Sequence, residues 1–207
     1  MPTASSAERP ARRGRPGHDL ESVLAAAVRL FNERGYEATG MEALSRALGI
    51  TKSAIYHHVD SKEDLLRLAA DRALDGLFEA ADEALAREGR AIDRLEFLVE
   101  RSVLVLADRL PFVTLLLRVR GNTEVERRAL ERRRAFDHLV ADLMERAAAE
   151  GDLQAGLDPT VGARLLFGMV NSLIEWYRPG GDLDAAALAA LVRRTAFDGL
   201  RARPAGR

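Results

Sequence analysis

Six side chains that can bind an anion or form hydrogen bonds are concentrated in residues 52–62. They are Lys52, Ser53, Tyr56, His57, His58 and Lys62. The two lysines are the only ones in the chain, which has 29 arginines. Cationic, hydroxyl and imidazole groups of this kind contact phosphates and base edges in nucleic-acid complexes. The cluster therefore favours binding to a nucleic acid.

Metal binding and catalysis find less support in the sequence. Adjacent residues on a helix diverge by about 100°, so His57 and His58 do not face one site, and His18 and His138 have no matching ligands nearby in the sequence. The absence of cysteine excludes disulfides, thiolate zinc sites and cysteine nucleophiles. Glycine-rich phosphate loops and nucleophile elbows are also absent. We therefore expect no metal, no cofactor and no enzymatic activity.

The cluster lies on a predicted helix-turn-helix over residues 41–58. Thr39 and Glu42 resemble a capping box that opens the first helix, and Gly49 ends it. Thr51 can cap the second helix, predicted over residues 52–58, with Ile55 and Val59 facing inward. In such a motif the second helix enters the major groove of DNA.

The remaining chain also predicts helices, with no signal for a strand. Of its 207 residues, 47% are hydrophobic, 30% charged and 5% aromatic, which favours helix over sheet. Apolar spacing predicts an all-α fold of about nine helices. Besides the two helices of the motif, these cover residues 20–34, 61–88, 91–107, 109–119, 122–150, 159–177 and 183–201. We expect a DNA-binding domain over residues 18–62 and a second domain over residues 63–207.

The first 17 residues form a predicted flexible basic arm. Arginines alternate there with proline and glycine, which prevent regular structure. The net charge of the whole chain is only −1, but residues 1–62 carry +2 and the remainder −3. Such an arm suits a phosphate backbone or a minor groove, with Arg13 and Arg15 as contacts. An unstructured, solubilising tail is the alternative.

The sequence predicts a cytoplasmic protein that does not enter a membrane. Its N-terminus has no apolar segment of the kind that directs secretion. The longest apolar stretches, such as residues 185–192, are far shorter than the roughly 20 residues that span a bilayer.

Residues 13–65 resemble the DNA-binding domain of tetracycline-repressor (TetR) family regulators. The resemblance runs without a gap from RGRPGHDLESVLAAAVRLFNERGYEATG through MEALSRALGITKSAIYHHVDSKEDLL. It implies DNA contacts by Thr39, Thr51, Lys52, Ser53, Tyr56, His57, His58 and Lys62. Tyr56 and Lys62 are expected on phosphates and Lys52 and His57 nearer the bases, whereas His58 has a packing or capping role as its alternative. Ala54 replaces a polar residue of some relatives, so the operator sequence does not transfer.

The same resemblance implies a helical domain for ligand binding and dimerisation. Its last two long helices would pack against their copies in a homodimer. Small residues that would permit close approach are Gly162, Ala163, Gly168, Ala189, Ala190, Ala196 and Gly199. A two-fold dimer would present two recognition helices about one DNA turn apart to a palindromic operator.

A small-molecule inducer is expected between the middle helices. The candidate pocket walls are Leu104, Phe112, Leu116, Phe136, Phe167, Val170 and Asn171. Asn171 would orient a ligand or form an interhelical hydrogen bond. Residues 171–181 resemble regulators of catabolism that respond to acyl-CoA thioesters, which would place arginines such as Arg118 or Arg120 near the nucleotide phosphates. The arginines of residues 127–134 alternate with glutamates, so a salt-bridged surface is favoured there over a second anion site.

These observations predict a homodimeric repressor that binds double-stranded DNA and is released by a small molecule. A helical ligand-binding protein or enzyme without sequence-specific DNA binding is the alternative, and it would turn over a substrate. A constitutive architectural DNA-binding protein is a third class, and it would show weak sequence preference. The large apolar second domain disfavours the third class.

Overall fold

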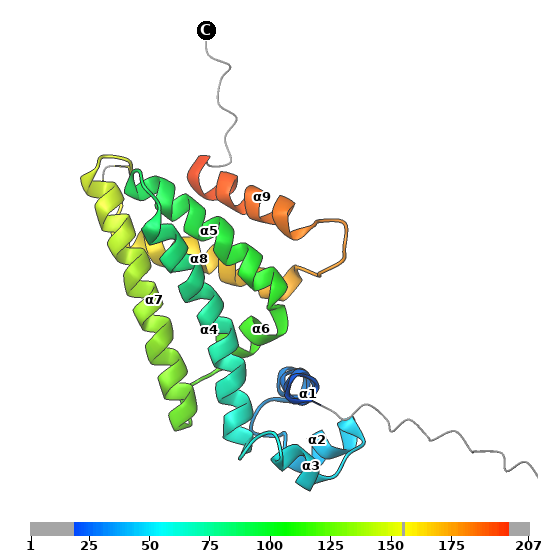
Figure 1. Ribbon diagram of the computed structural model, residues 1–207. Coiled ribbons are helices and arrows are strands. Elements are labelled where there is room, and N and C mark those ends of the chain that lie inside the picture. Colours follow the sequence, from blue (N-terminus) through cyan, green and yellow to red (C-terminus); the bar gives the residue numbers. More distant parts are fainter. Residues whose placement is uncertain (1–18, 155, 199–207) are drawn as a thin grey trace, which may run out of the picture.

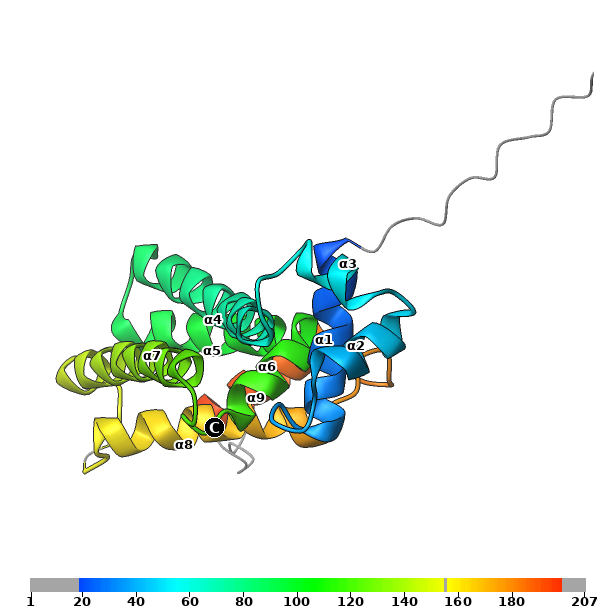
Figure 2. The same cartoon turned by 90° about the horizontal axis from the view of Figure 1, so that it is seen from below.

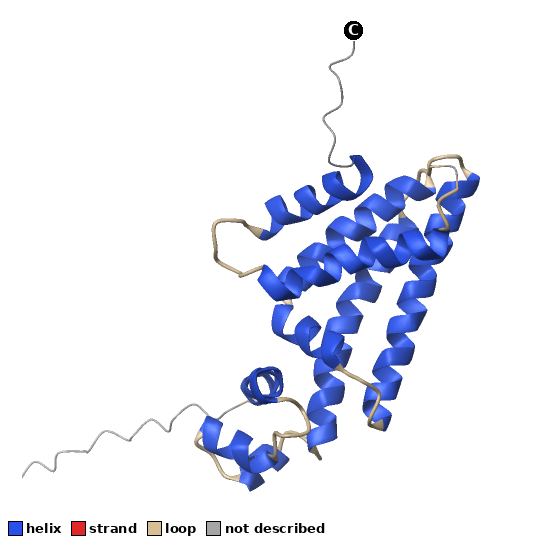
Figure 3. Cartoon of the chain, turned by 180° about the vertical axis from the view of Figure 1, so that it is seen from behind, coloured by secondary structure: helices blue, strands red, loops and turns tan. Residues whose placement is uncertain are grey.

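The computed structural model describes residues 19–154 and 156–198, and this part of the chain is entirely helix, turn and loop. Figures 1 and 3 show the arrangement. In these residues there are nine helices: α1 (Leu20–Arg34), α2 (Met41–Leu48), α3 (Lys52–Tyr56), α4 (Lys62–Ala86), α5 (Ala91–Asp108), α6 (Leu110–Arg118), α7 (Glu124–Ala149), α8 (Pro159–Trp176) and α9 (Ala185–Asp198). The predicted all-α fold is confirmed. The basic arm with Arg13 and Arg15 lies outside the described residues.

Two local predictions near the N-terminus were wrong. Gly40, not Thr39, is the N-cap of α2, and the Thr39 hydroxyl donates to the Gly35 carbonyl at 2.8 Å, so no capping box forms. Helix α3 ends at Tyr56 rather than at residue 58, because the chain turns there to return the buried Val59 to the core. His57 and His58 consequently lie in a turn.

A small core holds the N-terminal helices together. The apolar face of α1 packs over Leu44 of α2, Ile55 of α3 and the first turns of α4. Leu44 and Ile55 are 2% and 0% exposed. Burial of side chains of this size stabilises by about 1.5–3 kcal/mol each, which holds the short helix α3 in place although five residues form no stable helix alone.

Helix α4 contributes to both hydrophobic cores, as the shorter helix α6 also does. It starts at a capped terminus, where the Ser61 hydroxyl accepts from the Asp64 amide at 3.1 Å. Leu65 and Leu66 belong to the N-terminal core, whereas Ala73 and Leu74, two turns later, belong to the larger core formed by α4–α9. Figure 1 shows α4 running from the N-terminal helices into the larger bundle, beside α5 and α7.

Helices α8 and α9 bury one face and leave the other open. Val161, Leu165 and Trp176 of α8 are 49%, 67% and 54% exposed. Helix α9 packs mainly on α5, and Leu191 is 44% exposed. Figure 2 gives the view from below, in which α8 lies along the outside of the bundle.

Three of the seven small residues expected at a dimer contact are used inside the chain. Ala163 and Ala189 are buried, and a side chain at Gly162 would collide with Met144. Gly168, in contrast, faces open space. Gly199 lies outside the described residues. The three inward positions allow α8 and α9 to approach their own bundle.

Candidate nucleic-acid interface and ligand cavity

The helix-turn-helix brings most of the predicted DNA contacts onto one exposed segment. Gly49 takes the left-handed conformation (φ 67°) that ends α2, and the Thr51 hydroxyl caps α3 by accepting from the Ala54 amide at 3.2 Å. These two constraints fix how α3 leaves α2. The exposed side chains that follow are Thr51, Lys52, Ser53, Tyr56, His57 and His58. Tyr56 is 48% exposed, which is unusual for an aromatic residue in a packed domain.

Thr39 does not share this surface. Its side chain is 1% exposed, and its hydroxyl bonds to carbonyls at the C-terminal end of α1. The Thr39 side chain therefore stabilises the loop between α1 and α2. His58 is exposed rather than packed in the core.

The two lysines of the segment are held by neighbouring side chains. Lys52 lies 3.5 Å from the Glu42 carboxylate in an exposed ion pair. The Lys62 ammonium lies 4.0 Å from the centre of the Tyr36 ring, a cation–π contact. Burial raises the pKa of Tyr36, and the nearby Glu63 and Glu37 carboxylates add to the effect. Tyr36 therefore stays neutral at physiological pH and holds Lys62 at the start of α4.

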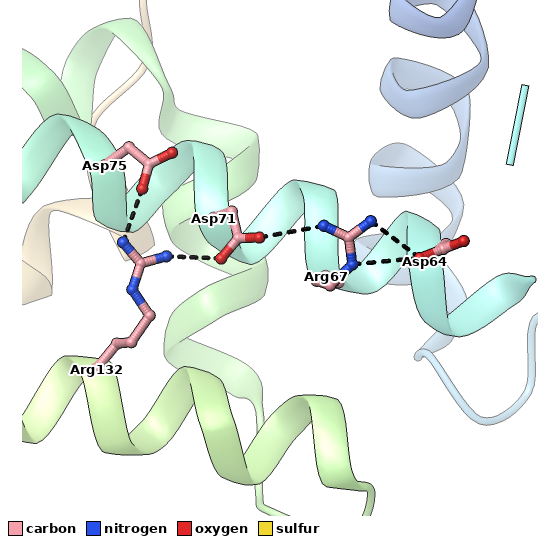
Figure 4. Close-up of polar contacts among 5 residues, drawn as sticks. All are labelled: Asp64, Arg67, Asp71, Asp75 and Arg132. Carbon is pink, nitrogen blue, oxygen red and sulfur yellow. Dashed lines mark hydrogen bonds and ion pairs between the residues drawn. The ribbon is translucent and has the colours of Figure 1, made fainter.

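A chain of ion pairs runs along α4 and crosses to α7 (Figure 4). The Arg67 guanidinium lies between Asp64 and Asp71, at 2.9 and 3.5 Å. Arg132 of α7 then contacts Asp71 at 2.6 Å and Asp75 at 2.7 Å. We call these five residues the α4–α7 ion-pair chain. It joins the first turn of α4, next to the helix-turn-helix, to the middle of α7.

A second connection joins α1 to α6. The Asn32 side chain donates to the Pro111 carbonyl at 2.8 Å, and Arg118 donates to the Asn32 carbonyl at 3.0 Å. Phe112 lies in the same seam, with the Arg72 guanidinium 4.9 Å from its ring centre. The structure thus places Phe112 and Arg118, which the sequence assigned to the ligand site, between α1 and the larger bundle.

An open groove of about 670 Å³ lies between α7 and α8, and it continues inward to a narrow slot. The slot has a volume of about 30 Å³ and reaches Leu77 of α4, Leu106 of α5 and Leu117 of α6. Groove and slot share four lining residues: Arg133, Asp137, Phe167 and Asn171. Five of the predicted pocket residues line the slot: Leu116, Phe136, Phe167, Val170 and Asn171. Leu104 packs against the core elsewhere.

The arginines of α7 divide into two groups. Arg127 and Arg128 pair with Glu124, and Arg132 pairs with α4. Arg133 and Arg134 line the groove, as does Arg164 of α8, and none of these three has an ion-pair partner within the described residues. The predicted salt-bridged surface therefore holds for only part of this run, because neighbouring positions on a helix face different surroundings.

Carboxylates also line the groove, so its charge is mixed. Asp137, Asp142 and Glu145 accompany the three arginines and His138. Partial burial raises the pKa of Asp137 although the residue keeps an exposed edge, and the nearby Arg133 opposes the rise. In the described part of the chain, no three histidine or carboxylate side chains converge as a metal site would require.

Sequence reasoning missed one buried polar group in the slot. Ser102 of α5 is 0% exposed, and its hydroxyl has no hydrogen-bond partner in the described structure. The signal was a lone hydroxyl within the apolar run of residues 102–107, comparable to Asn171 in α8. Periodicity alone does not show that these two side chains reach the same cavity.

Comparison with known proteins identifies the family. Residues 23–69 match the model for bacterial regulatory proteins of the tetR family, and residues 88–200 match the tetracyclin repressor-like C-terminal domain. The chain therefore belongs to the TetR family of bacterial transcriptional regulators. This confirms the resemblance seen in residues 13–65.

Three relatives show how far the similarity extends. The crystal structure of SCO3833, a TetR family member from Streptomyces coelicolor, is 52% identical, with a TM-score of 0.83 over 94% of this chain and 99% of that one. The transcriptional repressor KstR2 of Rhodococcus jostii is 29% identical over 90% of this chain and 93% of its own length. AibR, solved with isovaleryl coenzyme A and operator DNA, is 26% identical, with a TM-score of 0.71 over 86% of this chain and 97% of that one.

No helix within residues 19–154 and 156–198 has the length and apolar character needed to cross a membrane.

We predict that Arg132→Ala lowers the free energy of unfolding by about 1 kcal/mol, since Asp71 and Asp75 then repel one another without a cation between them. Urea denaturation measures the change, and the loss should shrink at high salt because all three side chains are partly exposed. Arg128→Ala is the matched control, because that exposed arginine pairs only with Glu124. An equal loss in both variants would contradict the prediction.

Proposed function

We propose that the protein is a homodimeric repressor that binds a palindromic operator and leaves it when a small molecule enters the larger domain. The observation that carries the proposal is the set of exposed polar side chains on α3 and its following turn. The larger bundle adds a groove of mixed charge that leads to a narrow, mostly apolar slot. We place the boundary between the DNA-binding and ligand-binding domains near residue 62, where α4 begins.

DNA binding follows from how α3 presents its side chains. Lys52 and Ser53 lie at its N-terminal end, the part of a recognition helix that reaches base edges. Tyr56, the last residue of α3, and Lys62, the first residue of α4, are assigned to phosphates, while His57 and Lys52 are assigned to bases. The Glu42 carboxylate near Lys52 must yield to DNA, which is feasible because both groups are exposed. Arg13 and Arg15 are assigned to the adjacent minor groove or backbone.

Replacement of Lys52 and His57 by alanine is predicted to abolish specific operator binding. Each lost base contact should weaken binding by about 1–3 kcal/mol, which is roughly 5-fold to 150-fold. The measurement is fluorescence anisotropy of a labelled fragment from upstream of the protein's own gene, with excess nonspecific competitor and at fixed salt.

Arg128→Ala serves as the control, because Arg128 lies on α7, in the larger bundle. If competitor DNA displaces the labelled fragment equally from the wild type, the double variant and Arg128→Ala, this fragment holds no operator. Selection from random DNA would then decide whether the protein reads sequence, and selection of no sequence would disprove the proposal.

Dimerisation is supported by the open apolar face of α8 and α9. Val161, Leu165 and Trp176 project from one side of α8, and Gly168 on that side leaves room for a close approach. Leu191 adds an exposed apolar side chain on α9. Large exposed apolar groups collected on one face mark protein contacts. A second copy of the chain would bury this face in an isologous four-helix contact.

Leu165→Glu is predicted to convert the dimer into a monomer, because it would bury two carboxylates without partners at a two-fold contact. Sedimentation velocity measures the state in solution. Leu20→Glu changes an exposed leucine of α1 (39% exposed) and should leave the assembly intact. A wild-type protein that sediments as a monomer at micromolar concentration would contradict the interface.

Ligand control is supported by the size of the slot. A cavity of about 30 Å³ has room for a water molecule but not for a hydrocarbon chain. Any larger ligand must therefore spread the helices that line the slot, so it binds a different conformation better than this one. That differential affinity is what allows a ligand to shift the equilibrium between two states.

The α4–α7 ion-pair chain offers a route from the slot to the DNA-binding helices. Phe136 lines the slot one turn after Arg132, and Arg133 lies where slot and groove meet. A displacement of α7 would move Arg132, and its ion pairs with Asp71 and Asp75 would then shift α4. Because α4 also packs in the N-terminal core, its displacement changes the separation of the two recognition helices in a dimer.

An acyl-CoA thioester is the inducer class we propose. Once its lining helices have moved apart, the slot suits the acyl group, and Arg133, Arg134 and Arg164 suit phosphates on the nucleotide, in place of Arg118 and Arg120. Two further observations agree: residues 171–181 resemble acyl-CoA-responsive regulators, and AibR was solved with isovaleryl coenzyme A.

Phenylacetyl-CoA or a fatty acyl-CoA is predicted to raise the melting temperature and release the operator, whereas the free acid and coenzyme A alone do neither. Arg133→Ala combined with Arg164→Ala should raise the required concentration about tenfold, because two charge-assisted contacts are lost. Arg128→Ala is again the control. Arg132→Ala should retain thioester binding but release the operator less completely. A flat response to all thioesters would disprove this inducer class.

A further inference from the structure

The slot contains a polar group that its apolar walls leave unsatisfied. Ser102 lies at the inner end, among residues that the open groove does not reach, whereas Arg133, Asp137 and Asn171 lie where the groove begins. The hydroxyl is fully buried and has no hydrogen-bond partner in the described structure. The apolar lining of the slot includes Leu106 of α5 itself and side chains from four other helices: Leu77, Val113, Leu116, Phe136 and Val170.

An unpaired buried hydroxyl is costly for the protein. On burial such a group loses its hydrogen bonds to water, and no partner in the described structure replaces them. Threonine and serine side chains on helices commonly avoid this cost by donating to a carbonyl in the preceding turn, as Thr114 does to Leu110 at 2.7 Å. Ser102 does not make that bond here, so its donor and its acceptor sites remain available to a group inside the slot.

We propose that Ser102 determines specificity by hydrogen bonding to an oxygen on the apolar part of the inducer. The inference rests on the proposed ligand-binding role of the slot and adds the chemistry of the buried end of the ligand. That end carries a hydroxyl or carbonyl group on an apolar body. A plain hydrocarbon end would leave Ser102 unpaired, and a site with a buried unpaired group discriminates against the analogue that lacks the oxygen.

The test uses phenol and toluene, which share a shape and differ in one hydroxyl group. Their dissociation constants are measured by calorimetry with the full chain, without DNA. An apolar cavity alone prefers toluene, because phenol must give up its hydration. We expect wild-type protein to bind phenol at least as tightly as toluene, and Ser102→Ala to weaken phenol relative to toluene by about tenfold, the effect of one buried hydrogen bond.

Two controls keep the test specific. Ser172→Ala removes an exposed serine of α8 whose hydroxyl already donates to the Met169 carbonyl, so the ratio of the two dissociation constants should not change. Ser102→Ala should fold at least as stably as the wild type, because it removes a hydroxyl without a partner. A clear loss of stability would show that the hydroxyl has a structural partner and would overturn the inference.

Other outcomes also overturn it. These are an unchanged phenol-to-toluene ratio in Ser102→Ala, and no binding of either fragment. Because the fragments carry no coenzyme A and the readout involves no DNA, the result is separate from the proposed inducer class. If acyl-CoA thioesters fail to release the operator while the fragments behave as expected, the coenzyme A part of the proposed inducer is wrong. The role of Ser102 then stands.

Discussion

The burial of α4 in two hydrophobic cores is the constraint on which the rest of the molecule depends. Leu65 and Leu66 anchor its first turns among α1, α2 and α3, and Leu74 anchors its middle among α5–α8. Protein interiors are close-packed and resist continuous deformation. In the proposed switch, a change in the larger core would therefore move α4 as a unit, and the N-terminal core would move with it.

Polar contacts supplement this shared helix at two places. The α4–α7 ion-pair chain ties α4 to the helix that carries Phe136 and Arg133, and Asn32 ties α1 to α6. These contacts are partly exposed, so each adds little to stability. Their importance is geometric, because they connect the walls of the slot to the helices that carry the DNA contacts. A slot too small for a ligand and a connected α4 together give the proposed switch its physical basis.

The described chain also leaves three features unsatisfied, and each corresponds to one proposed partner. The polar side chains around α3 face outward, the apolar face of α8 is open, and the Ser102 hydroxyl is buried without a partner. DNA, a second copy of the chain and an oxygen-bearing ligand would satisfy them in turn. Groups that are kept unsatisfied at a cost to stability are typical of functional sites.

The sequence by itself determined the nine helices, the helix-turn-helix and the family, because these depend on local spacing, caps and glycines such as Gly49. It also identified five of the twelve residues that line the slot, including Phe136, Phe167 and Val170, because these lie on apolar helix faces. Only the tertiary structure decided that Thr39 is buried, that Phe112 and Arg118 join α1 to α6, and that Arg132 pairs with α4 while Arg133 faces the groove. The tertiary structure also decided that the Ser102 hydroxyl is buried without a hydrogen-bond partner in the described part of the chain. The reason is physical: neighbouring positions on a helix point about 100° apart, and which partner each one meets depends on helices far away in the sequence.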